Sequence, residues 1–187
     1  MTIETAQQSA VDAPTEALAE RLERLLAEHA RPLERIAASY ARTLVEREDL
    51  LQDFAMAIWT ALPTFRGDAS ERTFLLRIAH NRAVTFLARR APRHGSVEDD
   101  AASAEASSGA NPAVAYERKE RGNQLLAAAR ALPLGHRQVL TLLLEGLSHR
   151  EIAGVLGVTE NNVAVRANRA RAALRVLLGD DQRKEKA

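Results

Sequence analysis

The sequence predicts an all-α protein, built as two small helical domains joined by a flexible acidic linker. Ala, Leu, Arg and Glu dominate the chain, Val, Ile and Thr are sparse, and no alternation of apolar and polar residues persists, which favours helices over strands. A small, acidic, Ser-rich stretch near the middle of the chain separates the helical segments into two groups.

Apolar residues recur at helical spacing in eight segments: 16–28, 32–43, 46–62, 70–90, 112–131, 135–145, 148–156 and 159–178. Residues 96–110 contain four acidic and no basic residues, and they offer too little apolar surface to form a core. We therefore expect a linker at 92–111 between domains at 16–91 and 112–179. Residues 1–15 are predicted to be a disordered leader, and residues 180–187 a solvated tail.

The composition excludes several functional classes. The 187 residues include no cysteine, which excludes disulfides and thiolate metal sites and fits a reducing cytoplasm. The N-terminal residues do not form a signal peptide, and no apolar run approaches the roughly 20 residues of a membrane span. No paired carboxylates, nucleophile–base pair or phosphate loop is recognisable. We therefore expect no catalytic residue, no metal and no cofactor, and we do not expect the protein to be an enzyme.

The charges are unevenly distributed, although the net charge is only +1. Residues 72–93 contain six Arg and no acidic residue, and residues 166–186 contain seven basic and three acidic residues. Two basic blocks on either side of an acidic spacer indicate surfaces for an anionic partner.

The segment "LSHREIAGVLGVTENNV" predicts a helix-turn-helix. Ser148 and Glu151 have the spacing of a capping box, Gly157 can end that helix, and Thr159 can cap the next one. The second helix carries Asn and Arg opposite its apolar stripe, as expected of a helix that enters the DNA major groove. A pair of helices that only pack together is the alternative.

The outward face of the predicted helix 46–62 carries Asp49, Gln52, Asp53 and Met56. Acidic and amide side chains around one soft apolar side chain are typical of a docking surface for a basic partner helix. A solvated face with one exposed methionine is the alternative.

The predicted helix 70–90 places Phe74 and Ile78 outward, beside Arg77 and Asn81. An exposed ring can stack on an unpaired base, while the amide reads a base edge and arginine holds a phosphate. On the helical wheel alone, packing of Phe74 and Ile78 against another helix of the same domain is an equal alternative.

Together these segments resemble the sigma factors of bacterial RNA polymerase, specifically the extracytoplasmic-function (ECF) type, which is group 4 of the sigma-70 family. "EDLLQDFAMAIW" looks like the segment that docks on the polymerase clamp, and "FRGDASERTFLLRIAHNRAVTFLARR" like the segment that melts and reads the minus-ten element. "LPLGHRQVLTLLLEGLSHREIAGVLGVTENNVAVRANRARAAL" looks like the domain that reads the minus-thirty-five element. The match covers roughly residues 30–178.

The resemblance implies a sigma2-like helical bundle and a sigma4-like helix-turn-helix domain. It implies bacterial core RNA polymerase, promoter DNA and a cognate anti-sigma factor as partners, with no membrane insertion. The residues it places at polymerase contacts are Asp49, Gln52 and Asp53, and the helical pattern adds the neighbouring Met56 to this candidate surface. It places at or beside the minus-ten surface Arg66, Phe74, Arg77, Asn81 and Arg82. Our candidates on the recognition helix are Asn162, Val165, Arg166, Asn168, Arg169 and Arg171.

The chain departs from the family pattern at four positions. The family often has Trp at Phe74, Asp at Thr85, and a basic residue and Ser at Ala164 and Val165, so two DNA contacts are expected to be missing here. Val165 could instead contact a thymine methyl group. Two other readings stay open: a sigma-like decoy that binds an anti-sigma protein, and a dimeric helix-turn-helix repressor with a palindromic site.

Overall fold

The computed structural model describes residues 4–90 and 112–184, with side chains described over 16–90 and 120–179. The elements are α1 (Glu4–Glu28), α2 (Ala30–Tyr40), α3 (Leu44–Ala61), the 3-10 turn η1 (Leu62–Thr64), α4 (Glu71–Arg90), α5 (Pro112–Ala131), α6 (Leu134–Leu144), α7 (His149–Leu156) and α8 (Glu160–Lys184). No strand occurs within these ranges, so the all-α prediction is confirmed.

The chain ends differ from the sequence-based expectation. In place of a disordered leader over residues 1–15, α1 is helical from Glu4, and in place of a tail from residue 180, α8 continues to Lys184. Six of the twelve residues 4–15 and three of the five residues 180–184 are Ala, Glu, Gln, Lys or Arg, which favour helix. The predicted linker at 92–111 lies outside the described residues; α4 and α5 flank it.

Local capping starts the helices on which the functional surfaces lie. In the predicted box, the Glu151 amide donates to Ser148 Oγ at 3.2 Å, and the Ser148 amide donates to Glu151 Oε2 at 2.9 Å. Gly157 ends α7 in the left-handed region at φ 66°. A second capping box, between Thr43 and Glu46, starts α3 two residues before the predicted helix.

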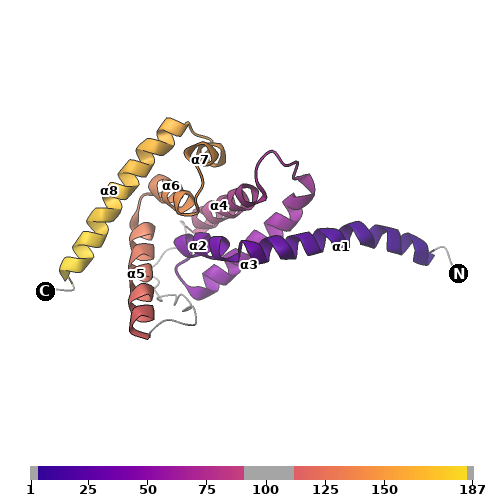
Figure 1. The fold of residues 1–187 in the computed structure, drawn as a ribbon, viewed down its shortest axis with the longest axis horizontal. Helices are drawn as coiled ribbons and strands as arrows, with labels where there is room; N and C mark the ends of the chain where they lie inside the picture. The colour runs from indigo at the N-terminus through magenta and orange to yellow at the C-terminus, as the bar shows by residue number, and fades with distance from the viewer. Residues whose placement is uncertain (1–3, 91–111, 185–187) are drawn as a thin grey trace.

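The two halves of the chain share one apolar core. Figure 1 shows α6 beside α2 and α4, with α8 along the outside and α1 projecting on the opposite side. Phe54 of α3 and Leu75 of α4 belong to the same buried cluster as Leu142 of α6 and Ile152 of α7. A smaller cluster lies between α5, α6 and α8. The sequence predicted two helical groups, but it did not predict that they pack against each other.

Polar contacts also cross between the halves. The Arg35 guanidinium of α2 donates to both carboxylate oxygens of Glu145, at 2.8 and 2.6 Å, and the Glu145 side chain is only 1% exposed. The backbone carbonyl of Glu145 accepts from Arg72, and Thr73 Oγ1 donates to Glu151 Oε1 at 2.7 Å. The first turn of α4 therefore contacts the C-terminal end of α6 and the first turn of α7.

We expect substitution of Arg35 to destabilise the protein more than substitution of its partner Glu145. Arg35→Gln should lower the free energy of unfolding by about 2 kcal/mol, because it leaves a buried carboxylate without its cation. Glu145→Gln should cost less than about 1 kcal/mol, because Arg35 is 55% exposed and can return to water. Urea unfolding followed by circular dichroism measures both. Equal losses in the two variants would contradict this account.

Candidate nucleic-acid interface

The outward face of α3 carries most of the predicted docking surface. Asp49 and Gln52 are exposed, and Met56 is 62% exposed, so an apolar side chain does lie among polar ones there. Asp53 differs from this pattern. Its side chain is 35% exposed and turns toward α4, where it accepts a hydrogen bond from Arg82 Nε at 2.8 Å. The expectation that Asp53 faces solvent is therefore wrong.

Arg82 serves as a link between helices in this structure. Its guanidinium makes a two-pronged ion pair with Asp53, since Nη2 also contacts the second carboxylate oxygen. This hydrogen bonding raises the pKa of Arg82. Arg82 was predicted as a minus-ten DNA contact, but its charge is already neutralised by α3. A phosphate would have to compete with Asp53 for it.

The ring of Phe74 faces inward, which corrects the prediction of an outward aromatic. Phe74 is 6% exposed, and its ring centroid lies 4.7 Å from that of Phe65. Arg77 covers the same ring, with its guanidinium carbon 5.8 Å from the centroid. A helical wheel cannot show this, because Phe65 reaches Phe74 from the loop that precedes α4. Phe74 cannot stack on a base without leaving the core.

Three of the predicted minus-ten residues remain on the surface. Arg66 is exposed in the loop before α4, and Arg77 and Asn81 are exposed one helical turn apart on α4 itself. Cationic groups beside an amide provide the contacts that phosphates and unpaired bases require. The sequence analysis did not identify Phe65 as the residue that covers Phe74. Phe65 is an aromatic residue in a loop otherwise rich in Pro, Gly and polar residues.

The recognition helix α8 has one buried and one exposed face, as predicted. Val163, Ala167 and Ala170 are buried. The exposed candidates are Asn162, Asn168, Arg169 and Arg171, and Val165 is 41% exposed. The amide of Asn162 donates to Thr159 Oγ1 at 3.2 Å, which confirms the predicted cap.

Arg166 is the candidate on α8 that the structure places differently. It is half-buried, and its Nη1 lies 3.4 Å from the position that a Cβ atom would take at Gly135 of α6. The guanidinium therefore lies against Gly135. To contact a phosphate, Arg166 would have to turn away from α6.

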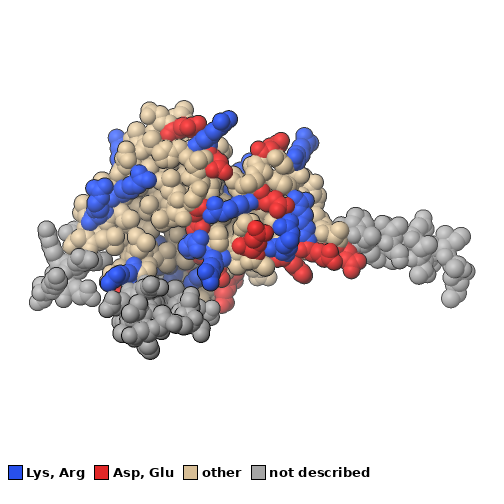
Figure 2. All heavy atoms as spheres, in the orientation of Figure 1, with Lys and Arg blue, Asp and Glu red and all other residues tan. Residues whose placement is uncertain are grey.

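The charge pattern of the surface separates α8 from the rest of the molecule. Figure 2 shows acidic and basic side chains intermingled where the two halves meet, whereas the basic groups over the middle of α8 have no acidic neighbours. Between residues 160 and 179, α8 carries four Arg and a single acidic residue, Glu160, in its first turn. This surface is suited to an anionic partner.

Over the described part of the chain, no three His, Cys, Asp or Glu side chains are grouped so that they could hold a metal ion. None of the described helices is both long and apolar enough to span a bilayer.

Comparison with known proteins identifies the family. The sigma-70 region 2 model matches residues 25–93, and the sigma-70 region 4 model matches residues 122–174. The ECF RNA polymerase sigma factor SigM of Mycobacterium tuberculosis is 33% identical over 160 residues, which cover 84% of this chain and 76% of SigM. The chain belongs to the ECF RNA polymerase sigma factors. The ECF sigma-E factor of Escherichia coli is 34% identical over 134 residues, which cover 67% of this sigma factor and 70% of that protein.

Solved structures show the same arrangement of helices. CnrH, solved in complex with the cytosolic domain of CnrY, is 28% identical with a TM-score of 0.62, covering 89% of this chain and 95% of CnrH. RpoE of Bartonella quintana, solved with the anti-sigma factor NepR, shares the fold with a TM-score of 0.67 at 21% identity, covering 88% of this chain and 98% of RpoE.

As a sigma factor, the protein directs core RNA polymerase to specific promoters, melting the minus-ten element and recognising the minus-thirty-five element. This family is a non-enzymatic class of transcription factors. Matches to both regions, in the expected order, favour this function over the repressor alternative. A sigma factor solved in complex with an anti-sigma factor fits such a protein as a partner and not the decoy alternative.

Proposed function

We propose that this sigma factor uses three separate surfaces in promoter recognition. The outward face of α3, with Asp49, Gln52 and Met56, docks on the polymerase clamp. The loop before α4 and the face of α4 bearing Arg77 and Asn81 contact the minus-ten element, with Phe74 supporting that face from inside. The exposed face of α8 reads the minus-thirty-five element. The observation that carries the proposal is α8, whose apolar face is buried while its Asn and Arg side chains face solvent.

The residues of α8 have different roles in this proposal. Asn168 and Arg169 are exposed on the outward face of α8 and contact base edges in the major groove. Arg171 and, after turning away from Gly135, Arg166 contact phosphates. Asn162 lies in the first turn of α8, where the positive end of the helix dipole favours a phosphate. Val165 offers an apolar contact to a thymine methyl group.

Reading both promoter elements at once requires the two halves to separate. The elements are about 25 base pairs apart, or about 85 Å along the duplex. Thr73 of α4 contacts Glu151 of α7, and only short stretches of chain lead from this contact to Arg77 and to Arg169. While the contact holds, Arg77 and Arg169 can therefore lie at most about 50 Å apart. In this proposal, binding to core polymerase opens the contact between Arg35 and Glu145.

The proposal includes no covalent chemistry and places the protein in the cytoplasm, where polymerase and promoters are found. Free energy for melting comes from the capture of unpaired bases and from phosphate contacts. An anti-sigma factor is a further proposed partner, because RpoE was solved with one. A groove of about 740 Å³ between α2, α3, α5 and α6, edged by the exposed Leu44 and Leu144, is where such a partner could contact both halves.

Substitutions on α8 test the division between base and phosphate contacts. Arg169→Ala should lose about 1–3 kcal/mol of binding and relax the preference at one minus-thirty-five position. Arg171→Ala should weaken binding to all sequences alike and reduce the slope of log affinity against log salt by about one unit. Selection from a promoter library by reconstituted holoenzyme, repeated at two salt concentrations, measures both effects.

Arg175→Ala is the matched control, because Arg175 is also exposed on α8 but lies one turn beyond the proposed contacts. It should leave the selected motif unchanged. If Arg169→Ala selects the wild-type motif, the base-reading assignment fails. If Arg171→Ala alters a single base preference, the phosphate assignment fails.

A further inference from the structure

The loop between α3 and α4 carries Arg66 at its exposed tip. Few hydrogen bonds within the loop hold it in place. Its start is fixed by η1, where the Phe65 amide donates to the carbonyl of Leu62 at 3.2 Å. Its end is fixed at Ser70, whose Oγ accepts from the Thr73 amide at 3.0 Å. Residues 66–69 make no hydrogen bond with any described residue, and Gly67 has φ of 82°. The direction of Arg66 therefore depends on the spacing of the loop ends.

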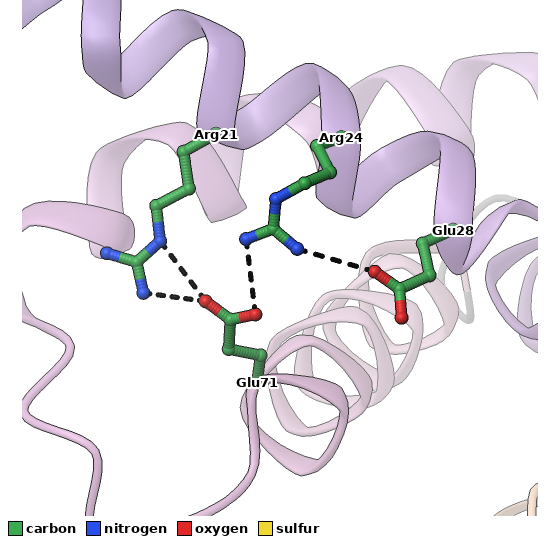
Figure 3. Close-up of polar contacts among 4 residues, drawn as sticks. All are labelled: Arg21, Arg24, Glu28 and Glu71. Carbon is green, nitrogen blue, oxygen red and sulfur yellow. Dashed lines mark hydrogen bonds and ion pairs between the residues drawn. The ribbon is translucent and has the colours of Figure 1, made fainter.

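One side chain from α1 contacts both ends of this loop. The guanidinium carbon of Arg21 lies 5.5 Å from the ring centroid of Phe65, at the start of the loop. Arg21 Nε and Nη2 also donate to Glu71 Oε1 at 3.2 and 2.7 Å, immediately after the end of the loop. Figure 3 shows Arg21 and Arg24 extending from α1 toward the Glu71 carboxylate.

Other residues also hold Phe65 and Glu71, the two residues that Arg21 contacts. Phe65 also packs against Phe74, at 4.7 Å between ring centroids. The second oxygen of Glu71 accepts from Arg24 Nη2 at 3.3 Å, and the hydrogen bond from Arg21 is the largest cause of the lowered pKa of Glu71. Glu71 also lies in the first turn of α4, where a negative charge is favourable.

The helix that supplies Arg21 is itself anchored. Leu25 of α1 is fully buried, and Leu18, Leu22 and Leu26 pack against the same core. Arg21 and Arg24 nevertheless lie before residue 25, where the match to the sigma-70 region 2 model begins. The family match therefore assigns them no role.

We propose that Arg21 is a positioning residue, which holds the two ends of the α3–α4 loop and so fixes Arg66 against the minus-ten element. This proposal rests on the proposed minus-ten surface. The planar guanidinium is essential to it, because one flat group must stack on an aromatic ring and donate two bonds to a carboxylate. A lysine can supply the charge but not the stacked fork.

The test uses holoenzyme reconstituted from the full chain and core polymerase, with selection from a library randomised at the minus-ten element. Arg21→Gln should reduce discrimination at the positions that depend on Arg66 by about tenfold, as expected for loss of one cation–π contact and one part-exposed ion pair. Core affinity and the minus-thirty-five preference should not change. Arg21→Lys should recover only part of the loss. Arg24→Gln, which removes a contact to Glu71 but none to Phe65, should stay within about twofold of wild type.

A double-substitution cycle separates positioning from a general loss of stability. If Arg21 acts through Arg66, adding Arg21→Gln to Arg66→Ala should cause no further loss of discrimination. Additive losses, or wild-type discrimination in Arg21→Gln, would overturn the proposal. Equal effects of Arg21→Gln on both promoter elements would also overturn it, since they would indicate a folding defect.

The same experiment distinguishes this proposal from the proposed function. If Arg66→Ala changes the minus-ten preference and Arg21→Gln does not, only the positioning role fails. If Arg21→Gln changes the preference and Arg66→Ala does not, Arg21 does not act through Arg66, and the positioning role fails together with the assignment of Arg66. If neither variant changes it, both proposals fail.

Discussion

Replacing Asp49 with lysine should weaken binding to core RNA polymerase by about thirtyfold, equivalent to about 2 kcal/mol. Asp49 is exposed on the outward face of α3, beside Gln52 and Met56, and it forms no ion pair within the described residues. The substitution therefore reverses a charge at the proposed docking surface without removing an internal contact. Titration of labelled protein with core polymerase, at two salt concentrations, measures the effect.

Two comparisons make this experiment specific to the docking surface. Glu23→Lys reverses an exposed charge on α1, outside the proposed interface, and should bind core polymerase as the wild type does. Asp53→Lys should fail in a different way, because it breaks the ion pair with Arg82 and so lowers stability as well as affinity. Wild-type binding by Asp49→Lys, or an equal loss in Glu23→Lys, would refute docking through α3.

Acid should destabilise the protein through His80, by about 3 kcal/mol between pH 6.5 and pH 4. His80 is 1% exposed, and burial lowers its pKa from 6.5 to about 4. Among the described residues its Nε2 atom has no hydrogen-bond partner, and Nδ1 lies 3.4 Å from the hydroxyl of Tyr40. The neutral imidazole is therefore the form that the folded protein accepts.

The sign follows from the proton count in the two states. Between pH 6.5 and pH 4 the unfolded chain binds a proton at His80 that the folded protein does not, so stability falls as the pH falls. Above about pH 7.5 this contribution is constant. The pKa of Glu71 and that of Glu151 are lowered from 4.5, so their losses begin at the acid end of this window.

The measurement is urea unfolding at pH values from 7.5 to 4, for wild type and for His80→Leu. The difference between the two proteins isolates His80 from the carboxylates. We expect the wild type to lose stability relative to His80→Leu as the pH falls. Parallel curves for the two proteins would show that His80 does not titrate in this window.

Helix caps and apolar stripes could be predicted from the sequence, because they depend on residues that are close together in the chain. The Ser148–Glu151 box, Gly157 and the apolar stripe of α8 act within one or two helical turns, and the structure confirms each of them. The exposed methionine on α3 followed from helical periodicity in the same way.

Contacts between distant segments were not predictable. Phe74 was assigned to the surface because the wheel of α4 does not include Phe65, which folds over it. Asp53 and Arg82 were assigned to separate binding surfaces, although each neutralises the other across two helices. Burial of Glu145 depends on Arg35, which lies 110 residues earlier in the chain. Periodicity places a side chain on a face of its own helix, but it cannot show what covers that face.

Run-off transcription tests the central claim most directly. The full chain is combined with purified core polymerase on a library of promoter fragments, and transcripts are mapped to their start sites. The account predicts transcripts that start downstream of a shared pair of motifs about 25 base pairs apart, and that are lost with Asp49→Lys. If no fragment yields a transcript, although the protein binds core polymerase, the central claim is contradicted.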